Sequence, residues 1–232
     1  MHSLTMRILL SATVVAAALT ACVDKPGAVN NSTGSNTVSV PEVDWHATDT
    51  LFRLMGGVQG KTVADLYVGD GYYTLKLLEA GARVIAMDDD PGNVDALAAK
   101  ARELGIGEDR LIIRNAQPGT PNLALNEVDL ALCTRQFTSI PDRTEYFRKV
   151  KAAIKPPCQL FIVDFLPEQT PVGPPQDQRV SELQVMDAME PVGFTDIGGY
   201  TRKLPYRFVV QAMDFVEGTP TDGPPVQVQA PM

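Results

Sequence analysis

A glycine-containing turn and an acidic stretch are the parts of this sequence whose residue types could do chemistry. The turn reads Asp65-Leu66-Tyr67-Val68-Gly69-Asp70-Gly71 and follows an apolar run. Glycines between a strand and a helix let the backbone approach a ligand closely, and the helix N-terminus that follows favours an anionic group. A second apolar run ends in Asp88 and Asp89, where a carboxylate can accept hydrogen bonds from both hydroxyls of a ribose. Together the two segments predict a site for a nucleotide-like ligand.

Each feature also has a simpler structural explanation. Asp88 could cap the next helix, with Asp90-Pro91 as its entrance, and the glycines could serve the tight turn alone. We favour a ligand site because the features fall in one strand–helix–strand unit and in register.

The elements that must position these residues alternate along the chain, which predicts a mostly parallel sheet with crossover helices. The patterns predict helices over 48–55, 73–80, 93–104, 143–154 and 181–189, and strands over 62–68, 83–87, 110–114, 128–133 and 159–165. Two further strands, 195–202 and 206–215, are joined by a link too short for a crossover helix, so they must pair as an antiparallel hairpin. The predicted fold class is α/β, a doubly wound, mostly parallel seven-stranded sheet that ends in this hairpin.

The turn resembles that of the class I methyltransferases that use S-adenosylmethionine. In that family D-x-G-x-G-x-G-aromatic-aromatic-T precedes an acidic tip on the second strand, and the positions that match are Asp65, Gly69, Gly71, Tyr72, Tyr73, Thr74 and Asp88. Later segments resemble the tail of one bacterial subgroup: Val172-Gly173-Pro174-Pro175 with Arg179, Gly193-Phe194 and Leu204-Pro205-Tyr206. The resemblance covers almost all of the predicted domain, 41–217, and implies a Rossmann-like methyltransferase fold with S-adenosylmethionine as cofactor.

The resemblance also implies roles for single residues. The backbone of Gly69 and Gly71, with Asp70 between them, would face the methionine moiety of the cofactor, and Asp65 would help to hold its amino group. Asp88 would bind the ribose and Asp89 would border the adenine. Asn115 stands where the family often has an acid that accepts the adenine amino group, and an amide oxygen can accept the same bond.

Tyr67 departs from the family because it replaces the first glycine of the turn, where a large ring could crowd or reshape the pocket. No general base stands out after the fourth strand, and Arg135 there is either a contact for an anionic substrate or a solvated surface residue. A dinucleotide site of the NAD type is the main rival for the same turn, but it requires a third glycine where Thr74 stands.

Two functional hypotheses follow. The first is a methyltransferase acting on an unknown small or envelope-associated acceptor; transfer from a sulfonium is largely a positioning problem, so a missing base does not exclude it. The second is a non-catalytic lipoprotein of the same fold that binds a nucleoside-like ligand or a protein partner. The position of the Tyr67 ring distinguishes them: a ring turned away from the pocket favours the enzyme, and a ring that fills it favours the second hypothesis.

The N-terminus predicts export. An uncharged run, 8–21, follows Arg7 and ends in Leu19-Thr20-Ala21-Cys22, which resembles the bacterial lipobox whose cysteine is acylated. We expect a signal peptide over 1–21, lipidation at Cys22, a flexible tether over 22–40 and a disordered tail over 218–232. Val23 after the cysteine favours the periplasmic face of the outer membrane. A cleaved signal with an incidental cysteine and a short membrane anchor are the alternatives.

Composition excludes several other classes. The net charge of -8, without a basic stripe, argues against a nucleic-acid partner. The only histidines are His2 and His46, so a zinc site or a Ser-His-Asp triad is implausible and we expect no metal. Cys133 and Cys158 should lie at opposite edges of the sheet, too far apart for a disulfide. Separately, we expect the protein to be a monomer.

Overall fold

The computed structural model describes residues 43–214. The segments predicted to be a signal peptide, a tether and a C-terminal tail, with the lipidation residue Cys22, lie outside these residues, and their assignments remain predictions. Within 43–214, no helix has both the length and the apolar character needed to cross a membrane.

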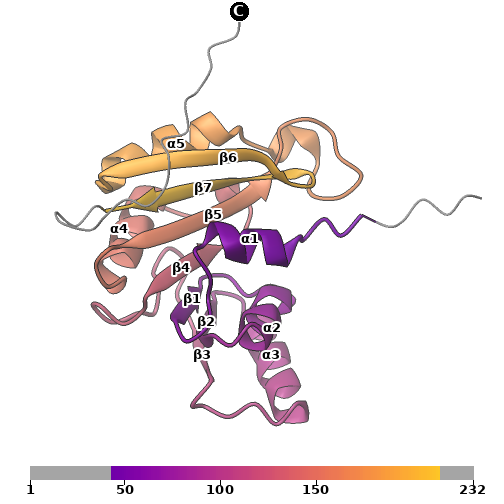
Figure 1. Ribbon diagram of the computed structural model, residues 1–232, viewed down its shortest axis with the longest axis vertical. Coiled ribbons are helices and arrows are strands. Elements are labelled where there is room, and N and C mark those ends of the chain that lie inside the picture. The colour runs from indigo at the N-terminus through magenta and orange to yellow at the C-terminus, as the bar shows by residue number, and fades with distance from the viewer. Residues whose placement is uncertain (1–42, 215–232) are drawn as a thin grey trace, which may run out of the picture. The chain divides into compact units, whose positions relative to one another are not determined.

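Seven strands form one sheet in the order β3-β2-β1-β4-β5-β7-β6 (Figure 1). The neighbours from β3 through β5 pair in parallel, whereas β7 runs antiparallel to both β5 and β6. The strands are β1 (Thr62–Asp65), β2 (Arg83–Asp88), β3 (Leu111–Asn115), β4 (Leu130–Cys133), β5 (Gln159–Phe165), β6 (Asp196–Leu204) and β7 (Arg207–Met213). The predicted fold class, including the C-terminal antiparallel hairpin, is confirmed.

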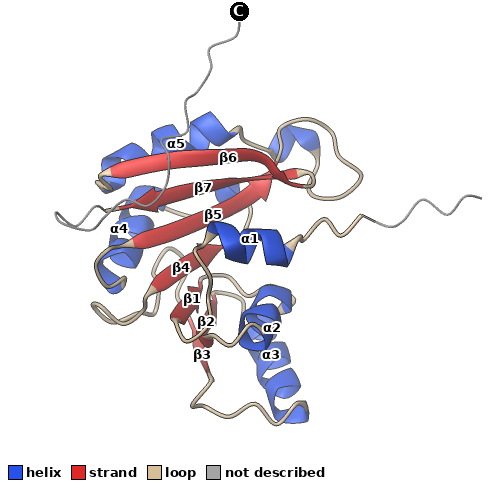
Figure 2. Ribbon diagram, viewed as in Figure 1, coloured by secondary structure: helices blue, strands red, loops and turns tan. Residues whose placement is uncertain are grey.

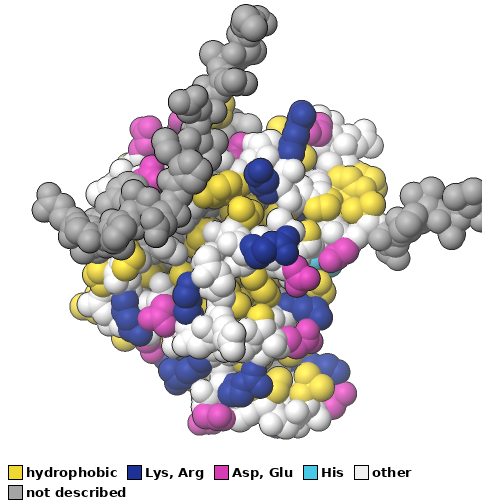
Figure 3. Space-filling view, in the orientation of Figure 1, with side chains coloured by type: hydrophobic (Ala, Val, Ile, Leu, Met, Phe, Trp, Pro, Cys, Tyr) yellow, Lys and Arg dark blue, Asp and Glu magenta, His cyan; other side chains and the backbone are white. Residues whose placement is uncertain are grey.

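Helices cover both faces of the sheet (Figure 2). One apolar cluster joins the sheet to α1, α2 and α3, and a second joins the other face to α4 and α5. The α-helices are α1 (Thr48–Leu54), α2 (Tyr72–Glu79), α3 (Pro91–Glu103), α4 (Arg143–Ala153) and α5 (Glu182–Met189). Short 3-10 turns lie at η1 (Phe137–Ser139), η2 (Gln176–Gln178) and η3 (Glu190–Val192). On the face seen in Figure 3, basic side chains are interspersed with acidic ones.

Local sequence signals set two of the helix starts. Asp90 caps α3 by accepting a hydrogen bond from the Gly92 N–H at 2.8 Å, and Pro91 occupies the first turn, which tolerates its missing N–H. Ser181 and Gln184 form a reciprocal capping box at α5.

The first strand is shorter than predicted, because it ends at Asp65 rather than at residue 68. The chain leaves the β4 ladder there: the Leu66 N–H still binds the Leu132 carbonyl at 3.0 Å, but the Val68 N–H binds the Met87 carbonyl of β2 at 3.1 Å. The turn therefore begins at Leu66, three residues before its first glycine, Gly69.

The order of the strands reverses between β1 and β4, because β2 and β3 lie to one side of β1 and β4 and β5 to the other. In open α/β sheets, ligands bind at the carboxyl ends of the strands at such a switch point. The segment Leu66–Gly71 and the residues after Cys133 both lie at this place.

Candidate ligand site

A cavity of about 350 Å³ lies at the switch point, within the size range of small-molecule sites. Of the residues predicted to bind the cofactor, Gly69, Asp70, Asp88 and Asp89 line this cavity. The other three, Asp65, Gly71 and Asn115, are absent from its lining.

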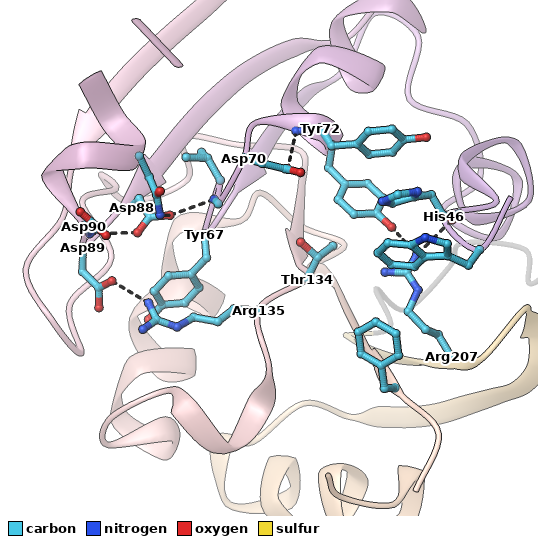
Figure 4. A pocket seen from close by; sticks show the side chains of 16 residues that line it. His46, Tyr67, Asp70, Tyr72, Asp88, Asp89, Asp90, Thr134, Arg135 and Arg207 are labelled. Carbon is cyan, nitrogen blue, oxygen red and sulfur yellow. Dashed lines mark hydrogen bonds and ion pairs between the residues drawn. The ribbon is translucent and has the colours of Figure 1, made fainter. Parts of the chain in front are cut away.

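Asp88 ends β2 and lies directly beside the glycine turn (Figure 4). Its Oδ2 accepts hydrogen bonds from the Gly69 N–H at 3.0 Å and from the Asn93 amide at 3.2 Å, and its Oδ1 accepts one from the Asp90 N–H at 2.9 Å. A carboxylate offers about four acceptor positions, so one position on Oδ1 is left for a ligand hydroxyl. Asp90, not Asp88, caps the next helix, so the simpler explanation for Asp88 does not apply.

The turn itself leaves room for a ligand. Gly69 and Gly71 adopt φ values of +52° and +80°, which residues with a Cβ rarely adopt. A Cβ added to Gly69 would meet no atom within 4 Å, so open space lies in front of its backbone. The Asp70 carboxylate accepts a hydrogen bond from the Tyr72 N–H at 3.0 Å and thereby fixes the turn onto α2.

Tyr67 points toward α4 rather than across the glycines. Its ring is 6% exposed and stacks on Tyr146 of α4 with centroids 5.5 Å apart. Burial raises the pKa of the Tyr67 hydroxyl to about 12. The ring is part of the core beneath the turn, with one side left at the cavity wall.

Arg135 covers that remaining side of Tyr67 (Figure 4). Its guanidinium lies 4.4 Å from the ring centroid, and its Nη1 forms an ion pair with Asp89 at 2.6 Å. Segments that follow β1, β2 and β4 are thus linked by one side chain, and Arg135 is neither free in solvent nor unpaired.

Asp65 lies under the turn and is fully buried. Its Oδ2 accepts the Thr74 hydroxyl at 2.6 Å, whereas its Oδ1 has no hydrogen-bond partner among the described residues. Burial, opposed by the hydrogen bond from Thr74 and aided by the charges of Asp88 and Asp70, raises the pKa of this carboxyl to about 7. Because Asp65 is fully buried and does not line the cavity, the role toward the cofactor that the resemblance implies for it stays a prediction.

Asn115 ends β3 directly beside Asp88 in the sheet register. It is exposed, and its backbone carbonyl accepts a hydrogen bond from the Asn122 amide at 3.0 Å. The role implied for its side chain stays a prediction.

The other half of the cavity is aromatic, and sequence reasoning missed most of it. Trp45 and His46, which precede α1, pack ring on ring with centroids 3.7 Å apart, and His46 stacks on Tyr72 at 3.8 Å. Phe165 at the end of β5 lies 5.6 Å from Trp45. The available signal was the single tryptophan of the chain standing next to a histidine just before a predicted helix.

Both members of the tyrosine pair that opens α2 line the cavity. Tyr73 is buried and its hydroxyl accepts a hydrogen bond from Arg207, whereas Tyr72 is partly exposed. Arg207 begins β7, and a buried arginine at the head of an otherwise apolar strand was a second usable signal.

His46 is the only histidine among the described residues, and it lies in the cavity wall. Burial, followed by the positive charge of Arg207, lowers the pKa of its imidazole below the usual 6.5. The ring is therefore neutral at neutral pH and can accept a proton.

Arg179, grouped in the sequence with residues 172–175, holds the loop after β5 in place. Arg179 donates to the carbonyls of Leu166, Glu168, Val172 and Pro174. Gly173 has φ +99°, and a Cβ there would approach the Phe165 ring to 2.5 Å. These contacts hold Phe165 in the cavity wall. The segment 172–175 with Arg179 therefore shapes the cavity by positioning Phe165, although Arg179 does not line the cavity itself.

Neither Cys133 nor Cys158 forms a disulfide, as predicted, and both are buried. Within residues 43–214, no group of three or more His, Cys, Asp or Glu side chains is placed to hold a metal ion.

Comparison with known proteins agrees with this geometry. Residues 63–157 match the family model described as a methyltransferase domain. These residues are therefore similar to a methyltransferase domain. The match begins in β1 and ends before β5, so it includes the glycine turn and the acidic tip of β2.

Solved methyltransferases share the fold over most of the chain. An S-adenosylmethionine-dependent methyltransferase from Aquifex aeolicus is 24% identical, with a TM-score of 0.67 over 73% of this chain and 90% of that one. A putative type 11 methyltransferase from Sulfolobus solfataricus is also 24% identical, with a TM-score of 0.55 over 75% and 95% of the two chains. The 1,6-didemethyltoxoflavin-N1-methyltransferase of Burkholderia thailandensis, solved with S-adenosylhomocysteine, is 22% identical, with a TM-score of 0.51 over 72% and 76%. No curated protein sequence matches the chain significantly.

The methyltransferase domain thus has a cavity with two unlike halves. The half beside β1 and β2 carries the glycine turn and the acidic groups, and the half beside α1, β5 and β7 carries aromatic rings and Arg207. One half suits a polar nucleoside and the other a partly apolar second ligand.

Proposed function

We propose that this methyltransferase domain binds S-adenosylmethionine beside β1 and β2 and transfers its methyl group to a small acceptor held by the aromatic half of the cavity. The observation that carries the proposal is the Asp88 carboxylate, which lines the cavity with one acceptor position free, opposite the open face of Gly69. A ribose hydroxyl is the natural donor to such a carboxylate at the tip of the second strand.

When bound, the cofactor supplies a methyl group on a sulfonium that needs no further activation. The chain's own residues then bind and orient. The backbone at Gly69 and Asp70 faces the amino-acid part of the cofactor, Asp88 accepts from its ribose, and Asp89 with Arg135 borders its base. Trp45 and Phe165 shield the acceptor from water, and the neutral His46 imidazole is available for the acceptor's proton.

The position of Tyr67 supports the enzyme over a non-catalytic protein of the same fold. Its ring packs on Tyr146 and leaves the backbone face of Gly69 open. A tyrosine at the first glycine position is therefore compatible with a bound nucleoside.

Calorimetric titration of S-adenosylhomocysteine into the full chain tests this function. We expect micromolar binding by the wild type, and binding weaker by about tenfold or more in Asp88→Asn, since a hydrogen bond to a charged group contributes about 1.5–3 kcal/mol. Asp95→Asn is the matched control, because this carboxylate is exposed on α3. A folded wild-type chain that binds no ligand at millimolar concentration would refute the proposal.

We also propose that the domain is exported and lipid-anchored at Cys22 on the periplasmic face of the bacterial outer membrane, as the lipobox-like sequence favours. Expression in a bacterial host with radiolabelled palmitate should label the wild type and not Cys22→Ala. Equal labelling of the two chains would refute the anchor.

A further inference from the structure

Arg207 is a buried cation without a carboxylate partner. Its side chain is at the start of β7 and only 2% exposed, and no ion pair joins it to any described acid. Its Nη2 donates to the His46 carbonyl at 3.0 Å and to the Tyr73 hydroxyl, while its Nε has no hydrogen-bond partner. A buried, uncompensated charge is costly, so this arrangement calls for a reason.

Aromatic rings surround the guanidinium but do not neutralise it. Its central carbon lies 5.1 Å from the ring centroid of Trp45, 5.4 Å from that of Tyr73 and 5.9 Å from that of Phe165. Cation–π contacts stabilise a positive charge and leave its sign unchanged. The region beside β7 therefore stays positive.

Asp164 is a buried acid that interacts with Arg207 through space but forms no ion pair with it: burial raises the pKa of the Asp164 carboxyl, and the charge of Arg207 opposes that rise. Asp164 lies on the neighbouring β5, and its two oxygens accept the backbone N–H groups of Phe137 at 2.9 Å and Phe165 at 2.7 Å. The guanidinium Nε–H thus remains available. The Tyr73 hydroxyl accepts from Arg207, which leaves its own proton free to be donated, since no described residue accepts it.

We propose that Arg207, with the Tyr73 hydroxyl, binds a carboxylate group of the methyl acceptor, and that the acceptor is a small carboxylic acid with a flat, apolar body. The inference rests on the proposed function, because it names the substrate class for the same cavity. A guanidinium matches the planar geometry of a carboxylate, and a flat body suits the ring faces of Trp45 and Phe165.

Charge around the cavity fixes the direction in which such an acceptor binds. The half of the cavity beside β1 and β2 is lined by four carboxylates, of which only Asp89 is paired with a cation, Arg135, so this half repels an anion. Arg207 lies in the opposite wall (Figure 4). The carboxylate is therefore drawn to Arg207, and the rest of the acceptor extends toward the cofactor half. The Trp45 ring and the His46 carbonyl border the guanidinium from the segment before α1, so an anion bound to Arg207 changes the surroundings of the Trp45 ring.

Trp45 is the only tryptophan of the chain, so its fluorescence reports on this site. The experiment titrates benzoate, and in parallel the neutral isostere benzamide, into the full chain without cofactor. We expect a saturable change with benzoate and an affinity for benzamide that is lower by about tenfold or more, since charge-assisted hydrogen bonds are the strong ones.

Arg207→Met should lose the preference for benzoate, whereas the matched control Arg148→Met, a half-exposed arginine on α4, should keep it. Circular dichroism shows whether Arg207→Met folds. If it does not, Tyr73→Phe, which removes the second donor together with the hydroxyl that accepts from Arg207, should weaken the binding of benzoate and leave that of benzamide unchanged. Equal affinity for the two probes, no response of Trp45, or an unchanged preference in folded Arg207→Met overturns the inference.

Titration of S-adenosylhomocysteine into the same preparation separates the two proposals. A chain that binds this nucleoside and shows no preference for benzoate retains the proposed function and loses only the substrate class. A chain that does not bind the nucleoside loses the proposed function itself.

Discussion

Replacing Tyr67 by glycine restores the family's turn motif, and we expect it to destabilise the protein. The ring is 6% exposed, stacks on Tyr146 at 5.5 Å and lies 4.4 Å from the Arg135 guanidinium. Removing a buried aromatic side chain costs about 3–5 kcal/mol, and the added freedom of glycine in the unfolded chain costs about 0.4–1 kcal/mol more. A loss of about 4 kcal/mol is a large part of the roughly 5–15 kcal/mol that stabilises a typical domain.

Urea unfolding followed by circular dichroism measures this loss. With a denaturant slope of about 2 kcal/mol per molar, the unfolding midpoint of Tyr67→Gly should fall by about 2 M. Tyr67→Phe keeps the ring on Tyr146, so its midpoint should change by less than about 0.5 M and its affinity for S-adenosylhomocysteine should match that of the wild type. A midpoint for Tyr67→Gly close to that of the wild type would refute the conclusion that the ring belongs to the core.

Three further predictions concern two buried groups and one partly exposed ion pair. Because the folded-state pKa of Asp65 is raised from 3.8 to about 7, its contribution to stability is full below about pH 4 and is lost as the pH rises toward 7. The free energy of unfolding in urea should therefore fall less between pH 4 and 7 in Asp65→Asn than in the wild type. An identical pH dependence of this free energy in the two chains would contradict the burial of an unpaired carboxyl. Cys133 is fully buried and its pKa is raised to about 12, so a thiol reagent should modify it only after unfolding; mass spectrometry of peptides from the native, labelled chain checks this. Glu127 has its pKa lowered to about 2 by Arg114, so Glu127→Gln should cost about 1 kcal/mol at pH 7 and nothing once the pH falls below about 2, as read from unfolding midpoints.

The cofactor half of the cavity could be predicted because its signals are local in sequence. The glycine turn and the tip of β2 lie within one strand–helix–strand unit, where a turn type and a strand end are both visible as short patterns. The antiparallel hairpin was likewise readable, since β6 and β7 are separated by only Pro205 and Tyr206.

The predictions that were wrong or left open depend on contacts between distant parts of the chain. The end of β1 was placed three residues late because Leu66 to Val68 are as apolar as a strand, and only their change of partner from β4 to β2 ends the ladder. The sequence left Arg135 either as a contact for an anionic substrate or as a solvated surface residue. Neither alternative included its ion pair with Asp89, because the two residues are 46 positions apart in the sequence.

The acceptor half shows the same limit more clearly. His46 and Arg207 are 161 residues apart and meet because the segment before α1 lies over the carboxyl end of β5 and the start of β7. No periodicity or motif connects two such residues, so the sequence predicted the ligand site without a base, and the only cation that it offered for an anionic substrate was Arg135, which is paired with Asp89. Each of the two residues is nevertheless unusual for its own position, a histidine beside the chain's only tryptophan and an arginine opening an apolar strand. Because a polar residue buried in an apolar element must find a partner, such misfits indicate where the second half of a site is assembled even when the fold that joins them is not yet known.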